Sequence, residues 1–181
     1  MRTALLLAIA TTLPLLAACQ SRATDTPATA STTSATPAAA PVAADLVERG
    51  EYLIRTAGCN DCHTAGYPES QGQMEKSQWL MGSRVGFKGP WGTTYATNLR
   101  LRTATMDEAQ WLAYTANLRT RPVMPDFNVR AMNEDDRRAI FHFIKSLGPA
   151  GDPAPVYLPP GENPPLPYYE LVLPGAVPPK A

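Results

Sequence analysis

The sequence has few of the residues that build disulfide frameworks, and its charge is balanced. Its 181 residues include three cysteines, of which Cys59 and Cys62 are close together while Cys19 stands 40 positions upstream of Cys59. This spacing argues against a disulfide scaffold, so each cysteine needs its own explanation. Basic and acidic residues number 16 each, which leaves no net charge to attract nucleic acid. DNA or RNA is therefore not an expected partner.

The chain also lacks an apolar run long enough to cross a bilayer. The run over residues 4–16 contains a proline and falls short of the roughly 20 residues that a transmembrane helix needs. With Arg2 before it and small residues after it, this run predicts a targeting segment over residues 1–18. Residues 16–19, Leu-Ala-Ala-Cys, resemble the lipobox of bacterial lipoproteins, with an ordinary secretory signal as the alternative. The resemblance implies that Cys19 is lipidated and anchors the mature chain to a membrane.

Residues 19–44 predict a flexible tether behind that anchor. Of the 25 residues from 20 to 44, 21 are Ala, Thr, Ser or Pro, and they show no periodic apolar face. Such a segment cannot offset the entropy lost on folding. We expect it to let a folded domain move over the membrane surface.

The other end of the chain, residues 149–181, contains 11 prolines in 33 positions, which excludes a helix. One interpretation is an extended strap that packs against the folded domain through Tyr157, Leu158, Tyr168, Tyr169, Leu171 and Leu173. The other is a polyproline segment that docks on a partner protein.

Residues 45–148 remain as one domain, with helical patterns over 45–57, 105–119 and 133–147. We expect the second helix to open with a capping box of Thr105 and Glu108. No stretch alternates between apolar and polar residues above noise, although 85–87 and 93–96 are candidates for extended chain. Gly50 on the first helix and Phe141 on the last are expected to meet where those helices cross. The domain is therefore predicted to be mainly helical.

The cysteine pair belongs to a five-residue motif. Residues 59–63, Cys-Asn-Asp-Cys-His, form the pattern C-x-x-C-H, which is typical of covalent haem c attachment. Two thiols at this spacing near a helix end can each bond a vinyl group of one porphyrin, and His63 is then placed under the iron. Structural zinc would need two further ligands, and the sequence has one other histidine, His142. A thioredoxin-like pair would need alternating strands and helices around the motif, and that pattern is absent.

Residues 45–148 resemble a class I cytochrome c. The resemblance rests on a helix that leads into C-x-x-C-H, a methionine in a downstream loop, and a final helix with acids at its start. It is most specific to the cytochrome domains of membrane-bound alcohol and aldehyde dehydrogenases, through residues 95–98 (Tyr-Ala-Thr-Asn), Met124-Pro125, and the helix from Glu134 to Leu147. It implies an all-α fold with three or more helices around one covalently attached haem. Those subunits usually carry several haem motifs and this chain has one, so a fixed subunit and a free shuttle both remain open.

The sixth ligand of the iron is the next question, and the candidates are Met74, Met81, Met106, Met124, Met132 and His142. Met106 and His142 fall on predicted helices, where packing or surface roles are expected. Met124 lies in Arg-Pro-Val-Met-Pro, where two prolines restrict the backbone and would hold its thioether in place. The ligand methionine of class I cytochromes occupies this position, so Met124 is predicted as the second metal ligand beside His63, with Met132 next. Trp91, Tyr95 and Asn98 are plausible donors to the haem propionates, although core or surface roles suit them equally.

These features predict a one-electron carrier and not an enzyme in its own right, although it could be the cytochrome subunit of a dehydrogenase complex. Its expected partners are redox proteins, such as a dehydrogenase, an oxidase or another cytochrome. The expected location is the bacterial periplasm, where covalent haem attachment takes place. Gln20 after the lipidated cysteine weakly favours the outer membrane over the inner one. The alternatives are a haem-based sensor or ligand-binding module and a peroxidase-like enzyme, each with an exchangeable sixth position.

Overall fold

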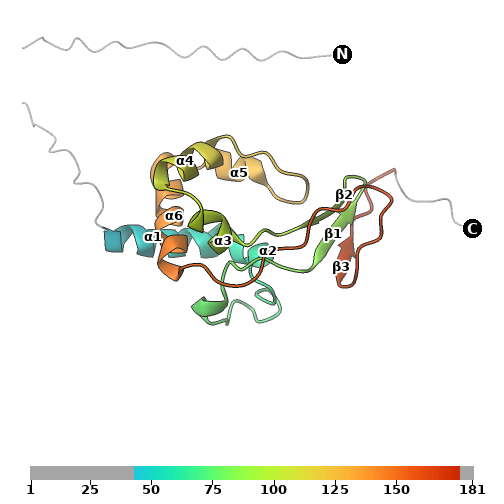
Figure 1. Cartoon of the computed structure of the whole chain (residues 1–181), viewed down its shortest axis with the longest axis horizontal. Helices are drawn as coiled ribbons and strands as arrows, with labels where there is room; N and C mark the ends of the chain where they lie inside the picture. Colours follow the sequence, from blue (N-terminus) through green and yellow to red (C-terminus); the bar gives the residue numbers. More distant parts are fainter. Residues whose placement is uncertain (1–42, 176–181) are drawn as a thin grey trace, which may run out of the picture. The chain divides into compact units, whose positions relative to one another are not determined.

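The computed structural model describes residues 43–175, so the predicted signal peptide, Cys19, most of the tether and residues 176–181 lie outside the described part. That part has six helices and a three-stranded sheet, with 43% of its residues helical and 11% in strands (Figure 1). The expectation of an all-α fold is therefore wrong, and the architecture is mixed. The elements are α1 (Ala43–Thr56), α2 (Cys59–His63), the short 3-10 helix η1 (Lys76–Gln78), β1 (Gly86–Gly89), β2 (Gly92–Tyr95), α3 (Leu99–Ala104), α4 (Glu108–Ala116), α5 (Asp126–Ala131), α6 (Glu134–Leu147) and β3 (Tyr168–Glu170).

The sheet combines a hairpin from the middle of the chain with a strand from the proline-rich tail. β1 pairs antiparallel with β2 and parallel with β3, in the order β2-β1-β3. The hairpin turns through Pro90 and Trp91, and Gly92 then takes a φ of 96°, which favours glycine. The extended segments expected near 85–87 and 93–96 correspond to β1 and β2. Glycine holds three of their eight positions, so no alternating pattern could mark them as strands.

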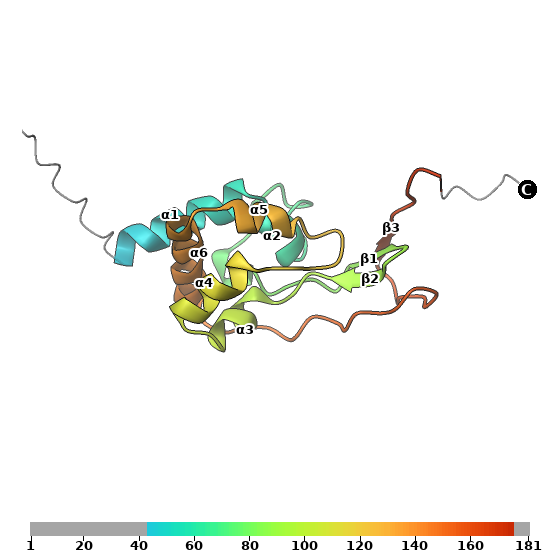
Figure 2. The same cartoon turned by 90° about the horizontal axis from the view of Figure 1, so that it is seen from above.

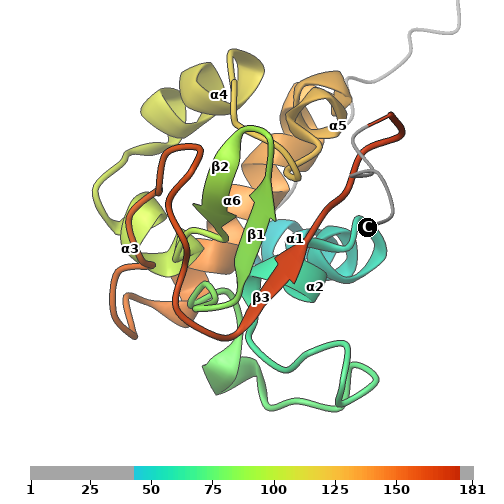
Figure 3. The same cartoon turned by 90° about the vertical axis from the view of Figure 1, so that its right-hand side faces the viewer.

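The tail lies along this sheet. Figure 3 shows it passing beside β2 before it returns to form β3 next to β1. Leu158 pairs with Thr93 through two backbone hydrogen bonds, of 2.8 and 3.0 Å. The tail therefore makes the contacts that the strap interpretation expects. Of the residues expected to pack, Tyr157, Leu158, Tyr168 and Leu171 are half-buried, whereas Tyr169 and Leu173 are exposed.

Helices α1 and α6 cross and supply much of the core (Figure 2). Gly50 lies at the crossing, where a Cβ would come within 2.1 Å of the Ala139 carbonyl oxygen and 2.6 Å of the Phe143 Cβ. The expectation that Gly50 allows this close approach is confirmed, but its partner is not Phe141. Residues 141 and 143 point about 200° apart around the helix. Phe141 therefore faces α4, where its ring centroid is 6.1 Å from that of Trp111.

We expect Gly50→Ala to lower the free energy of unfolding by up to about 2 kcal/mol. The added methyl collides with helix backbone that cannot move without shifting α6, and overpacking of this kind costs ~1–3 kcal/mol or more. This outweighs the ~1 kcal/mol by which alanine favours a helix over glycine. Denaturant unfolding measures the effect, with Glu48→Ala, at an exposed position of the same helix, as the control. Equal stability of the Gly50 variant and the control would contradict the close crossing.

The predicted start of one helix is confirmed, and the predicted start of another is wrong. The predicted third helix is α6, whose N-cap Asn133 accepts a hydrogen bond from the Asp136 amide at 2.7 Å. The second helix begins later than expected, because the capping box consists of Asp107 and Gln110 and not of Thr105 and Glu108. Met106, predicted to be helical, therefore lies in the turn between α3 and α4.

Candidate functional site

The C-x-x-C-H motif forms a helix of its own. Gly58 takes a left-handed conformation, with a φ of 70°, and separates α1 from α2. Cys59 and Cys62 are three positions apart, so their side chains lie on neighbouring positions of one face of α2. Both thiols are free and half-buried. The pair is therefore available to a group that bonds both sulfur atoms at once.

The environment of these thiols does not suit disulfide exchange. Burial raises the pKa of Cys59 to about 11, and burial together with the negative charge of Asp61 raises the pKa of Cys62. A redox-active C-x-x-C pair needs the opposite, a lowered pKa that keeps the attacking sulfur as thiolate. The environment thus agrees with the absence of a thioredoxin-like pattern in the sequence.

His63 is held in one orientation by the backbone. Its side chain is buried, and Nδ1 lies 2.7 Å from the Thr97 carbonyl oxygen. Because a carbonyl oxygen can only accept, Nδ1 carries the proton and Nε2 keeps its lone pair. Burial lowers the pKa of His63, although the bond to Thr97 opposes the shift, so the imidazole is neutral near pH 7. Metal-binding histidines typically show this pattern, in which the second nitrogen is tied to a backbone or carboxylate oxygen.

The Thr97 carbonyl lies where the chain at Gly82 contacts the segment after β2. The Gly82 amide donates to the His63 carbonyl oxygen at 2.7 Å. A Cβ on Gly82, whose φ is 82°, would lie 2.8 Å from the Asn98 nitrogen and from the Ala96 carbonyl oxygen. Glycine at 82 therefore lets the chain after β2 approach α2 closely enough for Thr97 to reach the imidazole.

Met124 is half-buried and lies in the loop between α4 and α5. Its carbonyl oxygen accepts the Asp126 amide at 2.9 Å. The Asp126 carboxylate accepts the Thr120 amide at 2.7 Å and the Arg130 guanidinium at 2.6 Å, which closes the base of the loop. From β2, the Thr94 hydroxyl donates to the Pro122 carbonyl oxygen at 2.7 Å. The loop is thus tied to the sheet two residues before Met124.

One short stretch of chain contacts His63 and the loop that carries Met124. Thr94 holds the Met124 loop, and Thr97 holds His63. Three residues of extended chain span roughly 10 Å. The motif helix and the methionine loop are therefore anchored to neighbouring points of the same segment.

The other candidates for the sixth ligand have different surroundings. Met74, Met106 and Met132 pack against the core cluster. The His142 Nε2 lies 2.7 Å from a carboxylate oxygen of Glu108, so that ring belongs to a hydrogen-bonded network at the surface of α6. Met81 is half-buried beside Gly151 of the tail. Among the methionines of residues 43–175, these contacts leave Met124 and Met81 outside the core cluster.

The three predicted propionate donors differ in the hydrogen bonds that their side chains already make within the protein. Asn98 is buried and caps α3, accepting the Leu101 amide at 3.0 Å and donating to the Ala150 carbonyl oxygen at 2.8 Å. The Trp91 indole donates to the Phe87 carbonyl oxygen at 3.3 Å. Tyr95 is half-buried, and its hydroxyl makes no hydrogen bond within residues 43–175. The structure therefore gives Asn98 and Trp91 structural contacts, and a propionate contact stays a prediction for all three.

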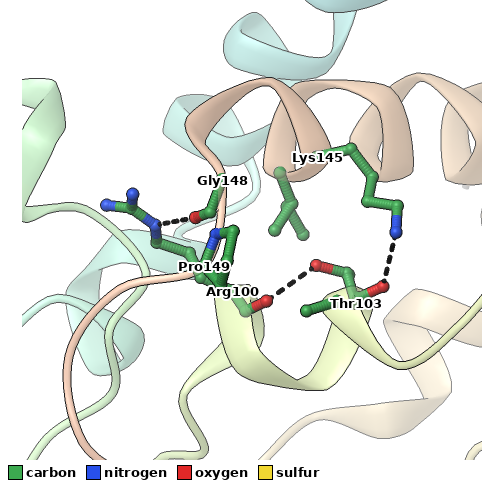
Figure 4. Close-up of a pocket in the computed structure, with 7 residues that line it drawn as sticks. Arg100, Thr103, Lys145, Gly148 and Pro149 are labelled. Carbon is green, nitrogen blue, oxygen red and sulfur yellow. Dashed lines mark hydrogen bonds between the residues drawn. The ribbon is translucent and has the colours of Figure 1, made fainter.

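A cavity of about 330 Å³ lies elsewhere, between α3 and the end of α6 (Figure 4). Arg100, at its edge, is buried without a carboxylate partner in the described region, and it donates to the carbonyl oxygens of Ser77, Leu147 and Gly148. Lys145 donates to the Thr103 carbonyl oxygen at 3.1 Å. Arg100 thus binds backbone carbonyls at the end of α6 and Lys145 binds one in α3, and none of the predicted haem-binding residues lines this cavity.

No protein-family model, curated protein or solved structure matches the chain. Over residues 43–175, no three His, Cys, Asp or Glu side chains gather in an arrangement that could hold a metal ion. An iron held within a porphyrin by one imidazole and one thioether needs no such cluster. None of the described helices has the length and apolar character needed to cross a membrane.

The residues present fit a covalently attached haem. Two free thiols share one helix face, and the adjacent imidazole has one nitrogen bound to the backbone and the other available. Sequence reasoning singled out residues 95–98 for their side chains but missed the carbonyl of Thr97 and the hydroxyl of Thr94. Every residue has a backbone carbonyl, so the residue type at position 97 does not indicate this contact. The sequence could therefore single out the segment around Thr97 but not its carbonyl.

Proposed function

We propose that this chain is a lipid-anchored, monohaem c-type cytochrome that carries single electrons between redox proteins in the bacterial periplasm. The observation that carries the proposal is the placement of His63, whose buried imidazole donates Nδ1–H to Thr97 and keeps Nε2 available beside two unpaired thiols. The raised pKa values of those thiols argue against a disulfide-exchange role for the pair.

Each residue of the site has a distinct task in this proposal. Cys59 and Cys62 would form thioethers with one porphyrin, and His63 would bind the iron through Nε2. Met124 would supply the second iron ligand, and its loop is held to the same segment that holds His63. The bound haem supplies an Fe(III)/Fe(II) couple, which accepts and returns one electron with no transfer of atoms. A neutral thioether opposite an imidazole favours Fe(II) and raises the reduction potential.

The proposed partners are redox proteins, namely a dehydrogenase as donor and an oxidase or a second cytochrome as acceptor. No residue is assigned a catalytic role. A lipid on Cys19 would keep the domain at the membrane surface, and the predicted tether would give it reach toward these partners.

The test is to express the full chain in a host that matures c-type cytochromes and to purify it from membranes. We expect one haem per chain that resists extraction by acidified acetone, and a reversible one-electron titration. Cyanide and carbon monoxide should bind slowly, because His63 and Met124 would both be bound to the iron. A colourless protein, or a pigment that acetone removes, would contradict the proposal. Rapid cyanide binding by a covalently held haem would favour a sensor or peroxidase-like module.

A further inference from the structure

Arg121 in the Met124 loop lies against Tyr157 of the proline-rich tail, 36 residues away in sequence. Its guanidinium carbon is 3.7 Å from the centroid of the Tyr157 ring, the shortest cation–ring distance in the described part. The Tyr157 hydroxyl donates to the Trp91 carbonyl oxygen at 2.8 Å, in the turn of the hairpin. One aromatic ring therefore joins the loop, the tail and the hairpin.

The tail is fixed on both sides of this ring, to the sheet after it and to the N-cap of α3 before it. After it, Leu158 pairs with Thr93 through two backbone hydrogen bonds. Before it, the Asn98 amide donates to the Ala150 and Asp152 carbonyl oxygens at 2.8 and 3.1 Å. A Cβ on Gly92 would lie 2.2 Å from the Leu158 carbonyl oxygen, so the tail lies tightly on the hairpin turn. Tyr157 thus offers the loop a surface whose position does not depend on Arg121.

The middle of the loop is held from outside at two adjacent residues. Tyr157 contacts Arg121, and Thr94 donates to the Pro122 carbonyl oxygen. Both residues lie just before Met124, whereas Asp126 and Arg130 close only the base of the loop. Loss of one outside contact would leave the thioether held by the other and by the two prolines.

We propose that the tail acts as a clamp on the sixth ligand, with Tyr157 and Arg121 as positioning residues that keep the Met124 thioether in place. The inference rests on the proposed function, since it assigns a role to the tail only if Met124 binds the iron. It goes further in making the proline-rich tail part of the redox site. The clamp sets how often the sixth position opens to an external ligand.

The test measures the rate of cyanide binding to the oxidised, haem-loaded full chain. Arg121→Gln and Tyr157→Leu should each raise this rate by roughly two- to fivefold, as expected for loss of a cation–aromatic contact whose cation is exposed. Arg121→Lys keeps the cation and should stay nearer the original rate. Arg102→Gln is the matched control, because Arg102 lies over the Tyr114 ring at 5.7 Å, outside the loop.

The double variant Arg121→Gln/Tyr157→Leu separates a clamp from two unrelated effects. If the two residues act as one contact, its cyanide rate should match that of the single variants. Unchanged rates in the single variants, or effects that multiply in the double variant, would overturn the clamp. An original chain without covalent haem would overturn the proposed function and the clamp together. Reduction potentials and thermal unfolding of each variant show whether a faster rate reflects the sixth ligand or a general loss of stability.

Discussion

Met124→Ala is expected to lower the reduction potential of the haem-loaded protein by on the order of 0.1 V or more, within the roughly 0.8 V range that axial ligands span. Removal of the thioether leaves the sixth position to water, which stabilises Fe(II) less well than a soft sulfur ligand does. The low-spin spectrum of the oxidised protein should be lost, and cyanide should bind within the mixing time. Redox titration, absorption spectra and stopped-flow mixing measure these three effects.

The matched controls are the other methionines. Met106→Leu and Met132→Leu should leave the potential and spectrum unchanged, because both side chains pack against the core and leucine preserves that packing. Met81→Leu is the decisive control, since Met81 also lies outside the core cluster. If Met124→Ala keeps the low-spin spectrum while Met81→Leu loses it, the assignment of the sixth ligand to Met124 is wrong and Met81 takes its place.

The helices that carry the site could be predicted because their signals are local. The acids and the Asn133 cap at the start of α6 act within one turn, and the apolar stripe after them is long enough to identify a helix. The same holds for α1, whose end the sequence placed at Gly58. Helices α3 and α5 were missed because each has six residues, too few to show a periodic face.

The sheet could not be predicted because its pairing is not local. β3 comes from a segment in which proline dominates, and it forms by pairing with β1, about 80 residues earlier in the chain. No pattern within Tyr168–Glu170 marks this pairing. The contact between Arg121 and Tyr157 depends on the same tail, so the sequence indicated a strap but not what the strap holds.

The paired replacement Cys59→Ser/Cys62→Ser is expected to abolish covalent haem attachment completely. Each thiol would account for one thioether, so a single replacement should leave haem held by one bond, and the double replacement should leave none. Acidified acetone would then extract any remaining pigment. Serine is close to cysteine in size, so the half-buried positions on α2 should still pack, and the far-ultraviolet circular dichroism of the unloaded chain can check this.

The third cysteine offers a control in which the two roles separate. Cys19→Ser should release the protein from the membrane fraction but keep an acetone-resistant haem, because lipid and porphyrin are assigned to different sulfur atoms. The Cys59→Ser/Cys62→Ser chain should show the reverse, a membrane-bound protein without haem. Fractionation followed by haem staining distinguishes the two. Covalent haem in the double variant, or its loss in Cys19→Ser, would mean that the sulfur atoms are assigned wrongly, and the proposed electron carrier would lose its chemical basis.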